Sequence, residues 1–369
     1  MNVHRPIAPF KMPVRPDTPD LLPDGIWFGL AEDDYHAQPR LSASGIKALH
    51  ASPVDFYVSS WLVPPEVEPA EEKEAFRIGT AFHKRILEGK PAFYARYAAD
   101  LDPADYPDAL RTVEQIKAAL VEAGAKPKHN VTKPELTDHL LSLVPDAQVW
   151  SVMLERHRAE TEGREPLSAR IITEIEIAAA MIERHPQLSK CFQSGYPEVS
   201  LFWTCAETGV PMKARADYLR LGGIFDLKTI TNTKRQPFST ACRQAISSQH
   251  YFIQAPLYHE GLAAVKALLR QRGLDVVHGP CDPNWVLRLA DTPAEPPFTF
   301  VFTQKGRAPV ARGLDFPSSL VAYGIGQDII AHQKRQFVRL AQQFGPDWWI
   351  DETPIEVIDD TQLPAWIGE

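Results

Sequence analysis

Three short apolar segments between residues 198 and 229 constrain the fold more than any other part of the sequence. They lie at 198–204, 212–219 and 224–229, and each is rich in β-branched, aromatic or aliphatic residues. Glu207-Thr208-Gly209 separates the first two and Gly222-Gly223 separates the last two, and both are turn sequences. Because connections this short join antiparallel neighbours, the segments predict a three-stranded meander.

Helical patterns flank this meander on both sides in the chain. With 44% hydrophobic and 23% charged residues, the composition is that of an ordinary globular protein. The element order therefore predicts an α/β fold with a mixed central sheet, a helical N-terminal part and a small helical insertion. We expect helices at 75–89, 168–185 and 318–344, a long helix at 238–272 bent at Pro256, a strand at 298–303 and a loop at 281–297.

The ends of the chain set the expected domain limits. Residues 1–24 are rich in proline and lack periodicity, which predicts a flexible arm before a domain at 25–369. The arm lacks the apolar core of a signal peptide, and no run of about 18 apolar residues occurs. These features predict a cytoplasmic protein without a membrane span.

The four cysteines, Cys191, Cys205, Cys242 and Cys281, form no CxxC pair. Their wide spacing favours reduced, mostly buried thiols of a cytosolic protein. An iron–sulfur cluster held by all four is the alternative.

Two aspartates and a lysine in the meander carry the main chemical signal. Asp226 and Lys228 are two residues apart on one strand, so both side chains point to the same face. The Gly222-Gly223 turn folds the preceding strand back and can bring Asp217 close to Asp226. Converging carboxylates suit Mg²⁺ or Mn²⁺, and a lysine beside them can orient a water molecule. The alternative is a surface hairpin with a salt bridge, but apolar neighbours indicate a buried strand.

The sequence around these residues resembles the PD-(D/E)XK nuclease superfamily. Asp217 followed by FDLKT resembles its core motif, with Ala216 where proline usually precedes the first aspartate. More specifically, the chain resembles the nuclease domain of RecE-type exonucleases (exodeoxyribonuclease VIII). The similar segments cover most of residues 25–260 and are DDYHAQPRLSASGIKAL, IGTAFHKRILE, PEVSLFW, ARADYL, FDLKTI and Gln254 with Tyr258.

The resemblance implies roles for further residues. His83 and Glu198 would join the two aspartates and the Leu227 main-chain carbonyl in holding two metal ions. Gln254 and Tyr258, which share a helix face, would contact the scissile phosphate region or support Lys228. The alternatives are a packed helix histidine, an edge-strand surface charge and ordinary helix surface.

Residues 108–144 resemble a SAP-type helix–extended loop–helix. Lys126, Lys128 and Lys133 lie in its loop and at the start of its second helix, where they can bind DNA phosphates. The alternative is a helical hairpin without a role in binding.

The resemblance implies a Mg²⁺-dependent exonuclease that degrades linear double-stranded DNA from the 5′ end and leaves 3′ tails for recombination by strand annealing. It also implies a ring-shaped homo-oligomer and a single-strand annealing protein as partner. The formal net charge of −8 counts against a nucleic-acid binder, although metal-binding carboxylates contribute to it. A structure-specific or defence-type endonuclease and a non-catalytic DNA-binding assembly protein remain as alternatives.

Overall fold

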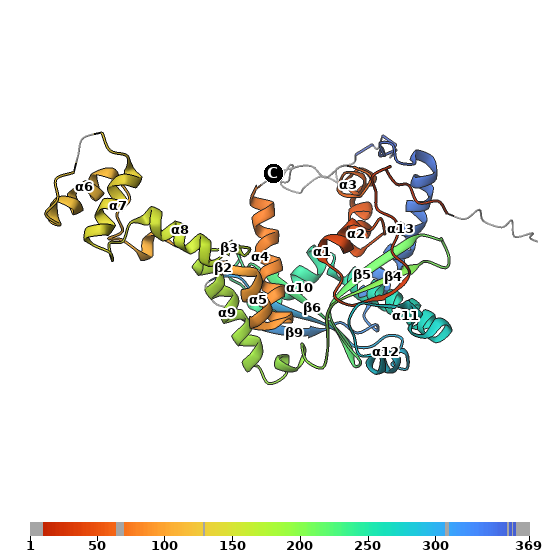
Figure 1. The fold of residues 1–369 in the computed structure, drawn as a ribbon. Coiled ribbons are helices and arrows are strands. Elements are labelled where there is room, and N and C mark those ends of the chain that lie inside the picture. Colours follow the sequence, from red (N-terminus) through yellow and green to blue (C-terminus); the bar gives the residue numbers. More distant parts are fainter. Residues whose placement is uncertain are drawn as a thin grey trace, which may run out of the picture. The chain divides into compact units, whose positions relative to one another are not determined.

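The computed structural model describes residues 10–63, 70–127, 130–306, 310–352, 354–355 and 357–358, which form two compact units (Figure 1). The first, here called the sheet unit, comprises Met1–Glu68, Lys190–Phe302 and Arg312–Glu369. The second, here called the inserted unit, comprises Pro69–Ser189 and Thr303–Ala311. The insertion predicted at 108–144 lies within this unit.

A seven-stranded sheet has the order β7-β1-β4-β5-β6-β8-β9. The predicted meander is present, because β4 pairs antiparallel with β5 and β5 with β6. β1 is antiparallel to β4 and parallel to β7, so the sheet is mixed and the predicted α/β class is confirmed. The strands are β1 (Gly25–Trp27), β4 (Gly195–Thr204), β5 (Pro211–Arg220), β6 (Gly223–Ile230), β7 (Val277–His278), β8 (Phe298–Gln304) and β9 (Ala311–Asp315).

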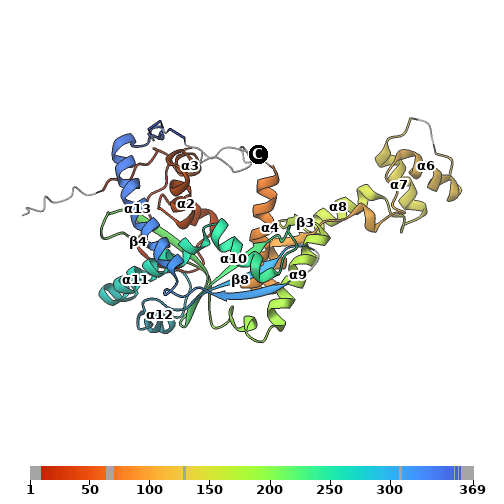
Figure 2. The same ribbon diagram turned by 180° about the vertical axis from the view of Figure 1, so that it is seen from behind.

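The middle of the sheet is covered on both faces, since the five consecutive residues from Val199 to Trp203 are all buried. Helix α11 (Gln254–Arg272) packs against β4 and β5, and α13 (Val321–Phe344) packs against α11, as Figure 2 shows. A β-carbon added to Gly261 of α11 would lie 2.7 Å from the Trp203 ring, so only glycine permits this approach. The other helices of this unit are α1 (Glu32–Ala37), α2 (Ala43–Ala51), α3 (Pro53–Ser59), α10 (Phe238–Ser248), α12 (Pro283–Ala290) and the 3₁₀ turns η3 (Tyr251–Ile253) and η4 (Gly273–Val276), while the 3₁₀ turn η2 (Leu188–Lys190) spans the boundary with the inserted unit.

The predictions for two segments of this unit, 238–272 and 281–297, were wrong in detail. The expected helix at 238–272 is interrupted before η3, where His250 has a φ of +50°, and does not bend at Pro256. Pro256 instead lies in the first turn of α11, where its missing N–H costs no helical hydrogen bond. The expected loop at 281–297 contains α12, which Asp282 caps by accepting a hydrogen bond from the Asn284 N–H at 2.9 Å.

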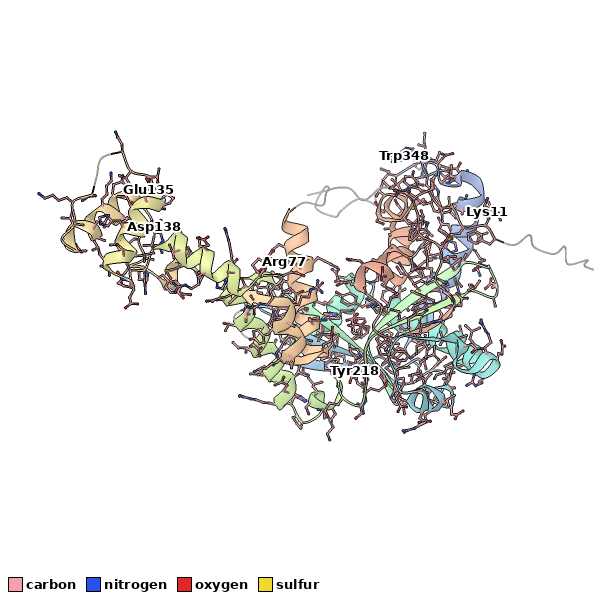
Figure 3. The ribbon with its side chains drawn as sticks, viewed as in Figure 1. Lys11, Arg77, Glu135, Asp138, Tyr218 and Trp348 are labelled. Atoms are coloured by element: carbon pink, nitrogen blue, oxygen red, sulfur yellow. The ribbon has the colours of Figure 1, made fainter. Side chains whose placement is uncertain are left out.

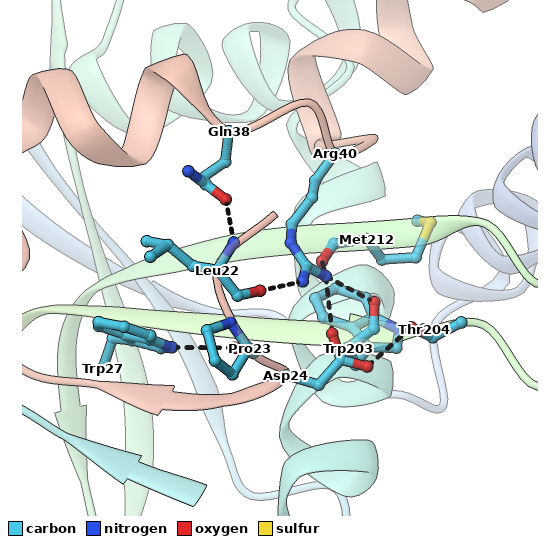
Figure 4. A network of polar contacts seen from close by, with 9 residues as sticks. All are labelled: Leu22, Pro23, Asp24, Trp27, Gln38, Arg40, Trp203, Thr204 and Met212. Atoms are coloured by element: carbon cyan, nitrogen blue, oxygen red, sulfur yellow. Dashed lines mark hydrogen bonds and ion pairs between the residues drawn. The ribbon is translucent and has the colours of Figure 1, made fainter. Parts of the chain in front are cut away.

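Residues 10–24, which the sequence assigned to a flexible arm, pack on the sheet unit. Figure 4 shows the polar network that holds this segment. The Arg40 guanidinium donates to the Leu22 carbonyl at 2.6 Å and pairs with Asp24 at 2.8 Å. Phe10 also packs on Phe337, with ring centroids 5.7 Å apart.

The inserted unit contains α4 (Ala70–Leu87), α5 (Gly89–Arg96), β2 (Tyr97–Ala99), the 3₁₀ turn η1 (Pro103–Asp105), α8 (Trp150–Glu160), β3 (Glu165–Leu167) and α9 (Ala169–Arg184). One core of this unit is built around Phe82, Phe93, Tyr97 and Ile175. The helix predicted at 75–89 corresponds to α4, which ends at Leu87, and α5 begins after this break at Gly89, whose φ is +85°.

A helix–loop–helix lies within the inserted unit, as the sequence predicted. Its helices are α6 (Val113–Glu122) and α7 (Lys133–Leu143), and both begin with a capping box. Figure 3 shows Glu135, which completes the box of α7 by accepting from the Thr132 N–H at 2.8 Å. The two helices have their own core of Ile116, Leu120, Leu136, Leu140 and Val149. In the part of the chain with described coordinates, no helix is both long and apolar enough to cross a bilayer.

Candidate metal centre

Asp217 and Asp226 meet at the centre of the sheet unit. β5 and β6 pair with Tyr218 opposite Phe225, and continuing this register places Asp217 opposite Asp226. The Asp217 Oδ2 accepts a hydrogen bond from the Leu227 N–H at 2.6 Å. Asp217 is 9% exposed and Asp226 is fully buried, so two carboxylates lie close together in a region that water hardly reaches.

Lys228 forms an ion pair with Asp226, and its side chain is only 14% exposed. Burial lowers the pKa of this lysine, but the charges of Asp226 and Asp217 act the other way and raise it above the usual value. Lys228 therefore carries its positive charge at neutral pH, next to the two acids.

Gln254 and Tyr258 of α11 lie beside the same carboxylate. The Gln254 Nε2 donates to the Asp226 Oδ2 at 3.3 Å and to the Tyr258 hydroxyl at 3.4 Å. Burial and the two nearby aspartates raise the pKa of Tyr258 well above its usual value. The pair thus surrounds Asp226 with neutral polar groups.

Glu198 lies next to Asp217 on the opposite side from Asp226. In the β4–β5 ladder, Pro197 pairs with Tyr218 and Val199 with Ala216, so Glu198 stands opposite Asp217. A Glu198 carboxylate oxygen lies within 4.8 Å of one from Asp217, and the Arg215 Nε is 3.9 Å from Glu198. Glu198 also has a φ of +51°, a left-handed conformation that is unusual for a non-glycine residue inside a strand.

The donor set of the sheet unit fits a hard divalent cation. Glu198, Asp217 and Asp226 provide three carboxylates within or beside the central strands, and oxygen ligands of this kind suit Mg²⁺ and Mn²⁺. The Gln254 Oε1 is buried and has no hydrogen-bond partner among the described residues, which is consistent with a bound water or ion shell facing it. We name Glu198, Asp217 and Asp226 the carboxylate cluster.

The comparisons with known proteins agree with this geometry. Residues 42–268 match the profile of a family described as a PDDEXK-like domain of unknown function (DUF3799), which is more than half of the chain. The chain belongs to this family. The PD-(D/E)XK resemblance found in the sequence is thereby confirmed.

No curated protein matches the sequence of this PDDEXK-like protein. A solved structure of an exonuclease candidate from Eubacterium rectale is similar at 14% identity and a TM-score of 0.33, and the match covers 67% of this chain and 88% of that one.

The remaining predicted residues lie in the inserted unit. His83 is on α4 and half-buried, and its role as a ligand stays a prediction. Lys126 is exposed in the loop after α6, whereas the Lys133 ammonium donates to the Arg111 carbonyl at 2.7 Å. Lys128 lies outside the described residues.

Cys205, Cys242 and Cys281 of this PDDEXK-like protein form no disulfide within the described part of the chain. Cys191, Cys205 and Cys242 are buried, and burial raises the pKa of the Cys242 thiol to about 11. A buried thiol with a raised pKa is inert, in keeping with packing cysteines.

Sequence reasoning missed two residues beside the carboxylate cluster. Tyr251, in η3, has the ammonium groups of Lys47 and Lys228 each 4.9 Å from its ring centroid. Lys47 lies within the GIKAL segment of the family resemblance, but nothing in its spacing links it to the meander. Only the packing of α2 against the rest of the unit brings it there.

Proposed function

We propose that this protein is a Mg²⁺-dependent deoxyribonuclease, and that the carboxylate cluster is its active site. The observation that carries the proposal is the convergence of Asp217, Asp226 and Lys228 on neighbouring strands of a PDDEXK-like domain. Burying two acids beside each other is costly, and structural needs alone do not account for it. Held divalent ions would offset that cost.

The chemistry is the hydrolysis of a DNA phosphodiester. Glu198, Asp217, Asp226, the Leu227 carbonyl and His83 would hold two Mg²⁺ or Mn²⁺ ions, and bound ions would supply positive charge that stabilises the attacking and leaving oxygens. Lys228 orients the attacking water and favours its deprotonation. The water oxygen bonds to phosphorus, the phosphorus–oxygen ester bond breaks, and a proton from the water ends on the leaving oxygen or solvent. Gln254 and Tyr258 keep the Asp226 carboxylate in position.

The proposed substrate is linear double-stranded DNA, degraded from the 5′ end to leave 3′ single-stranded tails. This part rests on the similarity to RecE-type exonucleases described above. The same similarity supports a ring-shaped homo-oligomer in the cytoplasm that acts with a single-strand annealing protein in recombination.

One assay tests the activity and its direction together. Linear duplexes labelled at the 5′ or the 3′ end, and covalently closed circular DNA, are incubated with the protein in Mg²⁺ or EDTA. We expect early release of the 5′ label in Mg²⁺, intact circles, and no reaction in EDTA. Cleaved circles would instead indicate an endonuclease, and a lack of cleavage of any substrate would leave a non-catalytic DNA-binding protein.

A further inference from the structure

Lys47 presents a positive charge to the carboxylate cluster without an acidic partner of its own among the described residues. It lies on α2, and Leu41, just before this helix, is tied to β5 by hydrogen bonds from its N–H to the Pro211 carbonyl at 2.9 Å and from the Lys213 N–H to its carbonyl at 3.0 Å. Ile46 on the same helix is buried in the core. The helix is therefore fixed relative to the strand that carries Asp217.

The contacts of Lys47 differ from those of Lys228. The Lys228 ammonium is paired with the Asp226 carboxylate, whereas among the described residues the Lys47 ammonium forms neither an ion pair nor a hydrogen bond. It lies instead over the Tyr251 ring, 4.9 Å from the centroid, and Lys228 contacts the same ring. Both ammonium groups therefore contact the same aromatic ring.

Lys47 is half-buried, and burial together with the Lys228 charge lowers its pKa to about 8, although Asp226 opposes the shift. Asp226 is already paired with Lys228, so the cation–π contact with Tyr251 is the close interaction of the Lys47 ammonium. A DNA phosphate bound at the carboxylate cluster would give Lys47 an anionic partner.

We propose that Lys47, held by Tyr251, is a second active-site cation that contacts the scissile phosphate of DNA. In phosphodiester hydrolysis the non-bridging oxygens gain negative charge as the water attacks, and a fixed cation beside them stabilises that charge. Lys228 acts on the water, which leaves Lys47 as a second cation beside the cluster that can contact the phosphate. Tyr251 is then a positioning residue. This inference rests on the nuclease activity proposed above.

The test compares Lys47→Met, Lys47→Arg and the exposed-lysine control Lys11→Ala with the parent protein. Cleavage of a short 5′-labelled duplex in Mg²⁺ gives kcat and KM, and thermal unfolding reports the fold. We expect Lys47→Met to lower kcat about 100- to 1,000-fold, as removal of an oxyanion donor does. Lys47→Arg should restore part of the rate, and Lys11→Ala should match the parent.

Variants at Tyr251 test the positioning role. Tyr251→Phe keeps the ring and should retain most of the rate, while Tyr251→Leu should lower kcat in the same direction as Lys47→Met. Calorimetry with Mn²⁺ should give parental affinity in Lys47→Met, since Lys47 binds no metal.

Two outcomes would overturn the inference: a parental kcat in Lys47→Met, or a loss confined to KM. If Lys47→Met unfolds early, Lys47→Gln gives the same comparison, and a folded Lys47→Gln with parental kcat is equally decisive against it. An inactive parent protein would count against the proposed nuclease function rather than against the role of Lys47.

Discussion

Glu198 stands opposite Asp217 across the β4–β5 ladder, with carboxylate oxygens within 4.8 Å and a left-handed backbone at φ +51°. A non-glycine residue held in this conformation costs roughly 1–3 kcal/mol, and such strain concentrates at functional sites. The sheet therefore maintains an unfavourable backbone at the position where a third carboxylate joins the cluster.

This relationship predicts an unusual order of stability at Glu198. Because glycine adopts positive φ without steric cost, Glu198→Gly should be more stable than Glu198→Ala by about 1 kcal/mol, the reverse of the usual order in a strand. Urea unfolding measures this difference. Both variants, and Glu198→Gln, should bind Mn²⁺ more weakly than the parent by calorimetry. Equal stability of the two variants would argue against strain at this residue.

Asp226 and Lys228 form a buried ion pair. Single and double variants of this pair should therefore affect catalytic activity and the free energy of unfolding differently. Asp226→Asn should abolish Mg²⁺-dependent cleavage and lower the free energy of unfolding by about 3–5 kcal/mol, because Lys228 loses its partner. Asp226→Asn combined with Lys228→Met should regain much of that stability but no activity. Substantial cleavage by purified Asp226→Asn would contradict the assignment of the metal centre.

Lys228 should act on the water without holding the metal. Lys228→Met is expected to lower kcat about 100- to 10,000-fold, the range of general acid–base contributions. Mn²⁺ affinity should be retained, because removing a neighbouring positive charge does not disfavour a bound cation. A calorimetric titration in which Lys228→Met no longer binds Mn²⁺ would show that this role is mistaken.

His83 is the predicted ligand that lies in the inserted unit. If its neutral imidazole binds metal, His83→Ala should weaken Mn²⁺ binding, and the affinity of the parent should fall in acid, because protons compete with the metal for the imidazole. The pH dependence should be smaller in His83→Ala. Identical affinities and pH profiles for the two proteins would leave His83 as a packing residue.

The helix–loop–helix should contribute to DNA affinity through its lysines. Replacing Lys126, Lys128 and Lys133 with alanine should flatten the slope of log affinity against log salt by roughly 0.9 for each phosphate that the variant no longer neutralises. The Lys133 ammonium donates to the Arg111 carbonyl, so removing it also removes a hydrogen bond that contributes to folding. Lys126→Ala alone therefore tests DNA binding without that loss of stability. The maximal rate at saturating DNA should not change. An unaltered slope in the triple variant would favour a hairpin without a binding role.

Much of the metal centre could be predicted from local sequence. The turn at Gly222-Gly223 joins two apolar strands directly, and a two-strand hairpin has its register fixed by that turn. The structure places the turn one residue earlier, at Leu221-Gly222, because Arg220 pairs with Gly223. Asp217 and Asp226 are equally distant from this turn, so their meeting follows from the hairpin register. The same holds for α6 and α7, whose apolar spacing and capping residues are local signals.

Other features depend on packing between distant segments. The sequence did not reveal that residues 10–24 bind to the sheet unit, since that contact uses Arg40, far along the chain from its acceptors in β4 and β5. The break before Tyr251 was also missed, because the apolar pattern continues through it and only the left-handed His250 redirects the helix.

The meander, its register and the pairing of Asp217, Asp226 and Lys228 could be read from the chain alone, because all three depend on a short turn and a two-residue repeat. The positions of Lys47 and Tyr251 beside that pair, and the strained backbone of Glu198, became visible only in the folded protein. They follow from how α2, η3 and the strands fill one core, which is a property of the whole packed unit that no local spacing records.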